Sequence, residues 1–172
     1  MLTRIILGGI VVFAIVAGAL LYYLQVYAYY EEIGADVANV QLVNLVTDQA
    51  EPVMFENYQG IDSDSSPLRY RACFDLSMSL AALTETYVIS DGAEPRVAPG
   101  WFDCFDAAAI GTDLASGEAV AFLGERDVTY GIDRIVAVYP DGRAMAWHQI
   151  NACGAVVFDG NPAPDGCAPP PE

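Results

Sequence analysis

The stretch IVAVYPDGRAMAWHQI, residues 135–150, decides the fold of this chain. Its two halves are rich in apolar, β-branched and aromatic residues, and Pro140, Asp141 and Gly142 separate them. Such a sequence favours a tight turn because proline presets φ near −65° and glycine accepts a positive φ. The stretch therefore predicts a β-hairpin with strands at 135–139 and 143–150.

Further strands are predicted on both sides of this hairpin. Residues 68–77 alternate between apolar and polar side chains, which is typical of a half-buried strand. Shorter apolar runs predict strands at 40–46, 87–90, 119–123 and 156–158. Residues 48–67 are rich in Pro, Gly, Ser and Asp and predict mostly loop.

One helix is expected within the domain. It begins near Asp103, whose carboxylate can cap free N–H groups, and Gly117 is a suitable stop. Runs of strands with one inserted helix predict the α+β class, with a small antiparallel sheet. We expect one domain over residues 31–160, in which 31–38 form a stalk, followed by a proline-rich tail at 161–172.

The N-terminal segment has the composition of a transmembrane helix. Residues 5–30 carry no charged side chain, and several tyrosines crowd their far end. Twenty apolar residues at about 1.5 Å each span roughly 30 Å, the thickness of the hydrocarbon core of a bilayer. Tyrosine suits the membrane–water interface. The alternative is a cleaved signal peptide, because Ala17-Gly18-Ala19 has the form of a cleavage site.

Orientation and cysteine placement point to a domain outside the cytoplasm. Arg4 precedes the span, and Glu31 and Glu32 follow it, so the positive-inside rule makes residues 1–4 a cytoplasmic stub. All the cysteines lie beyond the span, and an even number suits an oxidising compartment such as the periplasm. Three pairings are open. We favour the sequential one, Cys73–Cys104 with Cys153–Cys167, which ties the tail back to the domain.

The charge of the domain limits its partners. All 23 acidic residues lie from Glu31 onward, against six arginines and no lysine, which gives the domain a net charge of about −17. This disfavours nucleic acid and anionic membrane surfaces as partners. It is compatible with plain solubility, and also with a basic protein surface or a larger membrane protein complex as the partner.

Few residues suggest chemistry, and no catalytic residue, metal site or cofactor is predicted. Arg69 and Arg71 share one face of a strand and could clamp a carboxylate or phosphate, or could pair with the surplus acids. His148, the only histidine, lacks the spacing of a metal site. We expect it to be structural, to lie partly solvated on the face opposite Trp147, and to titrate near 6.5. Trp101 completes the candidates for a ligand site.

Several segments resemble an uncharacterised family of single-span, membrane-anchored bacterial envelope proteins. They are YYLQVY (22–27), APGWFDCF (98–105), YPDGR (139–143), AWHQIN (146–151) and CG (153–154). The resemblance implies a location in the envelope and no established activity. Two hypotheses remain: a non-enzymatic interaction or assembly module anchored in the inner membrane, and a periplasmic enzyme or small-ligand binder.

Overall fold

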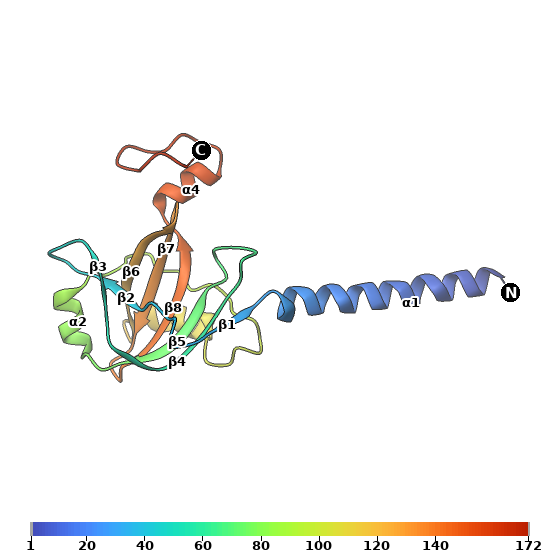
Figure 1. The fold of residues 1–172 in the computed structure, drawn as a ribbon, viewed down its shortest axis with the longest axis horizontal. Coiled ribbons are helices and arrows are strands. Elements are labelled where there is room, and N and C mark those ends of the chain that lie inside the picture. The colour runs from blue at the N-terminus through green and yellow to red at the C-terminus, as the bar shows by residue number, and fades with distance from the viewer. Residues whose placement is uncertain (1, 172) are drawn as a thin grey trace.

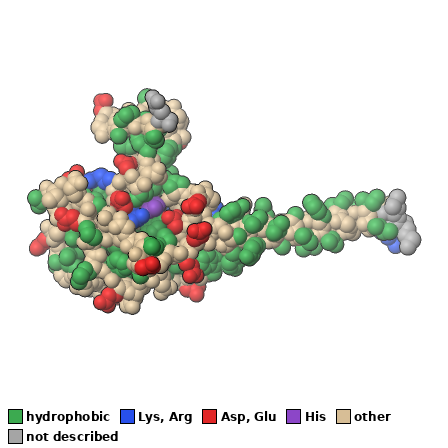
Figure 2. Space-filling model, viewed as in Figure 1, with side chains coloured by type: hydrophobic (Ala, Val, Ile, Leu, Met, Phe, Trp, Pro, Cys, Tyr) green, Lys and Arg blue, Asp and Glu red, His purple; other side chains and the backbone are tan. Residues whose placement is uncertain are grey.

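The computed structural model describes residues 2–171 and shows one long helix projecting from a compact domain (Figure 1). Helix α1 (Leu2–Tyr23) continues into a short π-helical segment, η1 (Leu24–Ala28). The side chains of residues 3–23 lie exposed, and Figure 2 shows hydrophobic side chains on the helix from the domain to its far end. The stretch Thr3–Ala28 is long and apolar enough to cross a membrane, by length and composition.

The domain is built on a six-stranded antiparallel sheet in the order β1-β4-β5-β8-β7-β6, and a two-stranded ribbon, β2–β3, lies beside it. The strands are β1 (Glu31–Ile33), β2 (Gln41–Val43), β3 (Ala50–Pro52), β4 (Phe55–Asp62), β5 (Arg71–Leu76), β6 (Val120–Thr129), β7 (Ile132–Val138) and β8 (Arg143–Ile150). The helices of the domain are α2 (Leu80–Thr86), α3 (Ala107–Ser116) and α4 (Ala152–Phe158).

Both faces of the sheet are covered, so its strands are buried on two sides. One face packs against α3 through Ile110 and contains the fully buried Trp147. The other face packs against α2 through Leu83 and contains Phe122. The predicted hairpin is confirmed as β7–β8, and the predicted alternation places Trp147 and His148 on opposite faces.

The fold class and the two disulfides are as predicted. Cys73 is bonded to Cys104, and Cys153 to Cys167. The first bond fastens β5 to the segment before α3. The second fastens the tail to α4.

Local sequence explains the helix ends. The carboxylate of Asp106, not that of Asp103, accepts hydrogen bonds from the first N–H groups of α3, and Gly117 ends the helix at φ 80°. Asp103 lies too early because the backbone between it and Asp106 is held in turns after Pro99. Helix α2 was not predicted, although Ser79 caps it by accepting from the Ala82 N–H at 3.3 Å.

Three segment predictions are wrong. Residues 31–33 form strand β1 rather than a stalk, because they pair with Gly60–Asp62 at the edge of the sheet. Residues 48–67 contain β3 and β4, whose alternation is hidden by a bulge between Glu56 and Gln59, with Asn57 at φ 53°. Residues 156–158 end helix α4 instead of forming a strand, since Asn151 caps that helix by accepting from the Gly154 N–H.

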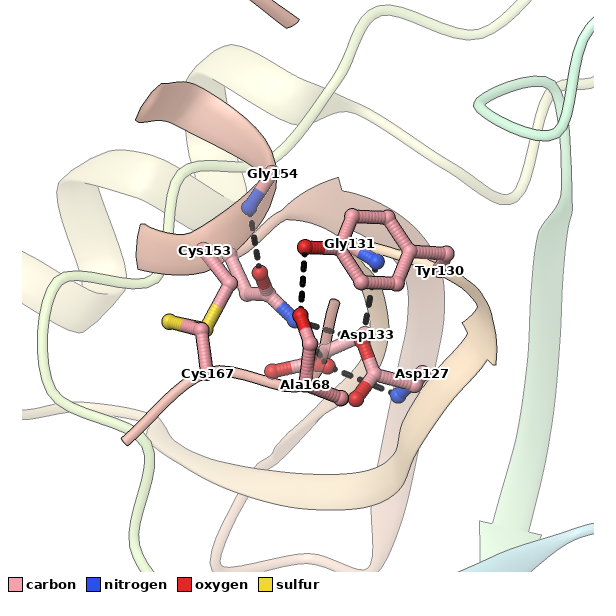
Figure 3. The surroundings of a disulfide bond; sticks show 9 residues. Asp127, Tyr130, Gly131, Asp133, Cys153, Gly154, Cys167 and Ala168 are labelled. Atoms are coloured by element: carbon pink, nitrogen blue, oxygen red, sulfur yellow. Dashed lines mark hydrogen bonds between the residues drawn. A yellow bond between two sulfur atoms is a disulfide. The ribbon is translucent and has the colours of Figure 1, made fainter. Parts of the chain in front are cut away.

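The tail is held at the far end of the β6–β7 hairpin (Figure 3). The Asp127 carboxylate accepts from the Gly131 N–H at 2.9 Å and from the Asn151 amide at 3.0 Å. The Tyr130 hydroxyl donates to the Ala168 carbonyl at 2.8 Å. These bonds and the Cys153–Cys167 disulfide connect hairpin, α4 and tail into one unit.

This unit depends on the close approach of two glycines. A Cβ on Gly154 would overlap the backbone of Gly131, which itself lies at φ 76°. We expect Gly154→Ala to destabilise the protein by about 2 kcal/mol, because a methyl group forced into a closed contact pushes α4 away from the turn. Urea unfolding measures the loss. Ala155→Ser, at an exposed neighbouring position, is the control, and equal stability of the two variants would contradict the prediction.

Candidate functional site

Two of the predicted ligand-site residues meet at Tyr30, immediately after the long helix. The Arg69 guanidinium carbon lies 5.3 Å from the centroid of the Tyr30 ring. The Trp101 ring meets the same ring edge-on, with centroids 5.9 Å apart. Because Tyr30 directly precedes β1, these contacts gather parts of the chain that are far apart in the sequence at the base of the helix.

Trp101 also contacts the helix itself. Its indole Nε1–H donates to the Val26 carbonyl at 2.7 Å, and its ring stacks on Tyr27 with centroids 6.2 Å apart. The Val26 carbonyl is available because it lies in the last helical segment, where carbonyls lose their partners within the helix. The loop around Trp101 is thereby fixed against the end of η1.

The Arg71 side chain is buried in the domain and binds backbone carbonyl groups. It is 4% exposed. The guanidinium donates to the carbonyls of Tyr70 at 2.6 Å and Leu68 at 2.8 Å, and to those of Arg96 and Val97 at 2.8 and 3.1 Å. Burial lowers the pKa of Arg71 to about 10, so it stays charged at neutral pH. Arg71 therefore joins the loop before β5 to the loop at 96–97.

The arginines of the domain fall into two groups. Arg126, Arg134 and Arg143 each lie within 4 Å of a carboxylate. Among the described residues 2–171, no such pair involves Arg69, Arg71 or Arg96, and the buried Nη1 of Arg69 has no hydrogen-bond partner there. All three lie in or beside the loops near the helix base. The alternative that Arg69 and Arg71 pair with the surplus acidic residues is therefore not what the structure shows among residues 2–171.

His148 lies on the opposite face of the sheet from Arg71, in a buried polar cluster. Its Nδ1 lies 2.6 Å from the Pro67 carbonyl and so carries the proton, while Nε2 accepts from Arg134 Nε at 3.2 Å. The Tyr70 ring stacks on the imidazole with centroids 4.6 Å apart. Both ring nitrogens are engaged by the protein itself.

The prediction of a partly solvated His148 titrating near 6.5 is wrong. The side chain is 5% exposed, because the loop through Pro67 folds over it. Burial, the largest cause, lowers its pKa to about 4, and the charges of Arg134 and Arg71 act in the same direction. The hydrogen bond to Pro67 acts in the opposite direction without cancelling them.

Sequence reasoning missed the other members of this cluster. The Arg134 guanidinium lies over the Tyr70 ring at 4.5 Å, and the Tyr58 and Tyr70 hydroxyls are 3.3 Å apart. Burial raises the pKa of both tyrosines and of Asp62. One of these contacts could have been predicted from the sequence. In a hairpin whose turn is centred on Asp141, Arg134 lies directly opposite His148.

Two of the hollows in the surface are relevant to binding. The larger, of about 630 Å³, lies between β1, the edge of β4 and the loop after Trp101, and includes Glu32, Gln59 and Asp103. The second, of about 380 Å³, lies on the side of the domain away from α1 and is mainly apolar. The second is lined by Pro52, Val53, Met54, Leu76, Ser77, Met78, Leu83 and Tyr87.

The candidate residues are thus divided between different places. Trp101 lines the larger hollow, Arg69 and Arg71 lie on the same side of the sheet, and His148 is buried on the other side. Within residues 2–171, no group of three or more His, Cys, Asp or Glu side chains is placed to hold a metal ion.

Comparison with known proteins gives one positive result. No curated protein and no solved structure matches the chain. Residues 40–168, which begin just before β2 and end in the tail, match a family described as a family of unknown function, DUF6446. The match covers most of the chain, including every strand from β2 to β8, both disulfides and the buried polar cluster, and the chain therefore belongs to the DUF6446 family.

Proposed function

We propose that this protein is a non-enzymatic interaction module, anchored by its first helix in the bacterial inner membrane with its domain in the periplasm. The anchor is supported by the helix itself. Cleavage after Ala19 would leave the exposed Leu20, Leu21, Tyr22 and Tyr23 in water at the start of the mature chain. A retained helix places these side chains in the bilayer and its interface, which suits their chemistry. Arg4 before the span and Glu31 after it support a cytoplasmic N-terminus.

The observation that carries the interaction role is the apolar groove on the side away from α1. Met54 is 81% exposed, and Met78 beside it is partly exposed. Methionine side chains adapt to varied surfaces and are frequent at protein-binding sites. A further hollow, which shares Val53, Met54 and Ser77 with the groove, is lined by Glu56. The negative charge of Glu51 lies close enough to Tyr87, in the wall of the groove, to raise the pKa of that tyrosine, although burial is the larger cause. Apolar chemistry with an acidic border fits a partner protein that presents apolar and basic side chains.

The second function, an enzyme or small-ligand binder, has one observation in its favour. The larger hollow is of ligand size and has an indole and several polar groups in its lining. Of the residues proposed from the sequence, it includes Trp101, whose indole N–H is already bonded to Val26. The interaction role is therefore the better supported of the two.

Purification of the full-length protein in mild detergent tests the interaction role. We expect a specific partner to be recovered with the wild type and with Val46→Glu, and to be lost with Met54→Glu. Val46 is 93% exposed and lies outside the groove, so it controls for an added surface charge. Recovery of the partner with Met54→Glu, or of no partner with the wild type, contradicts the proposal.

The anchor has its own test. Reporter fusions after Glu32 are expected to be active only with a reporter that works outside the cytoplasm, and the protein should remain in the membrane after carbonate extraction. N-terminal sequencing of the mature protein provides the opposing result: a chain that begins at Leu20 means that the helix is a signal peptide.

A further inference from the structure

The length of the helix defines where the membrane surface lies. The helical stretch Thr3–Ala28 has 26 residues, which is about 39 Å at 1.5 Å per residue, against about 30 Å for the hydrocarbon core. The tyrosines are concentrated at the domain end, at positions 22, 23, 27, 29 and 30. Because tyrosine favours the headgroup layer, the surplus length lies at this end, and Val26 and Tyr27 are at headgroup depth.

The domain reaches the same depth through one loop. Trp101 is bonded to the Val26 carbonyl and stacked on Tyr27, so the loop that carries it lies beside the last turn of the helix. Figure 1 shows this yellow-green loop, together with the loop before β5, on the side of the domain from which the helix projects. Both loops therefore face the plane in which the membrane surface lies.

The exposed chemistry of residues 95–102 suits that plane. The stretch reads PRVAPGWF, and Val97 is 81% exposed although it is apolar. Arg96 is exposed, and among the described residues neither it nor Arg69 has a carboxylate within 4 Å. Tryptophan is enriched at membrane interfaces, and a guanidinium binds phosphate well.

Acidic side chains lie at the same end, since Glu31 and Glu32 follow the helix and Asp103 follows the loop. A surface of mixed sign matches zwitterionic lipids, whose headgroups carry both a phosphate and an ammonium group. It fits a purely anionic surface less well, because the domain has a strongly negative total charge.

We propose that the loop 95–102 is a second membrane contact, which lies in the headgroup layer beside the helix. Val97 and Trp101 enter the interface, and Arg96 and Arg69 bind lipid phosphate. The contact holds the domain against the membrane in one orientation and keeps the apolar groove directed away from it. This inference rests on the retained helix of the proposed function.

Fluorescent probes on single cysteines test it in the full-length protein. All four native cysteines are in disulfides, so an introduced cysteine is the one reactive thiol. Val97→Cys reports on the loop, and Phe13→Cys reports on the helix. Val46→Cys is the matched exposed position, in the loop between β2 and β3, which Figure 1 shows on the side of the domain away from α1. Each labelled protein is reconstituted into phosphatidylcholine–phosphatidylethanolamine vesicles that contain lipids with a quencher in the headgroup or in the acyl chain.

We expect headgroup quenchers to reduce the emission at position 97 and to leave position 46 unchanged, while acyl-chain quenchers reduce the emission at position 13. Quenching at 13 without quenching at 97 overturns this inference and leaves the anchor intact. Absence of quenching at 13 overturns the anchor and this inference with it. In the Val97→Cys background, Trp101→Ala is expected to abolish the quenching at 97. Unchanged quenching in that variant overturns the role given to Trp101.

Discussion

Removal of the Cys73–Cys104 disulfide by the double substitution Cys73→Ala, Cys104→Ala is expected to lower the free energy of unfolding by about 4 kcal/mol. The bond joins positions 31 residues apart. In the chain-entropy description, opening a loop of that size gives the unfolded chain about this much additional freedom. Cys73 is also buried, and alanine avoids placing a hydroxyl group in the core.

Urea unfolding of the full-length protein in detergent, followed by tryptophan fluorescence, to which the fully buried Trp147 contributes, measures this loss. The control is Cys153→Ala, Cys167→Ala, which opens a loop with a separation of 14 residues, for which the same description gives about 3 kcal/mol. That bond fastens the C-terminal tail to α4 and closes the shorter loop. A smaller loss for the Cys73–Cys104 pair than for the Cys153–Cys167 pair would contradict the prediction.

The second large effect is acid destabilisation through His148. The folded protein holds its pKa at about 4, whereas the unfolded chain has the ordinary value of 6.5. Between these values the unfolded state binds more protons, so stability falls as the pH falls from 6.5 to 4. The difference between these two pKa values corresponds to a loss of about 3 kcal/mol in the free energy of unfolding, and this loss is complete below pH 4.

Carboxyl groups also contribute to the pH dependence of stability, because burial raises the pKa of Asp62 and the hydrogen bond from the Arg143 side chain lowers that of Asp141. The contribution of His148 is therefore measured as the difference between the wild type and His148→Gln, followed by denaturant unfolding at pH 7.5 and pH 4. A glutamine amide can donate to the Pro67 carbonyl and accept from Arg134, as the neutral imidazole does. Equal pH dependence of the two proteins would show that His148 is not the group responsible.

The same variant tests the structural role of His148. We expect His148→Gln to restore the phenotype of a deletion strain, since both ring nitrogens already bond to the protein. A variant that folds and reaches the membrane at normal levels without restoring that phenotype would count against the non-enzymatic proposal.

The sequence alone determined the features that depend on local patterns. The Pro-Asp-Gly turn with apolar runs on both sides specifies the β7–β8 hairpin, and strict alternation places Trp147 on one face and His148 on the other. The first helix follows from an apolar run without charge, because length and composition are properties of the segment itself. The sequence left three disulfide pairings open, and the sequential pairing that it favoured, with the shorter loops and their lower entropic cost of closure, is the one observed.

The tertiary structure decided what depends on contacts between distant segments. Alternation gives the face on which His148 lies, but only the loop through Pro67, 81 residues earlier, decides that this face is closed to water and that the pKa falls. Trp101 meets Val26 across 75 residues, and no local pattern signals that contact. β4 was missed because its bulge breaks the period on which strand prediction relies. Burial and partners are properties of the packed molecule, and for that reason the chemistry of these side chains could not be predicted from their neighbours in the sequence.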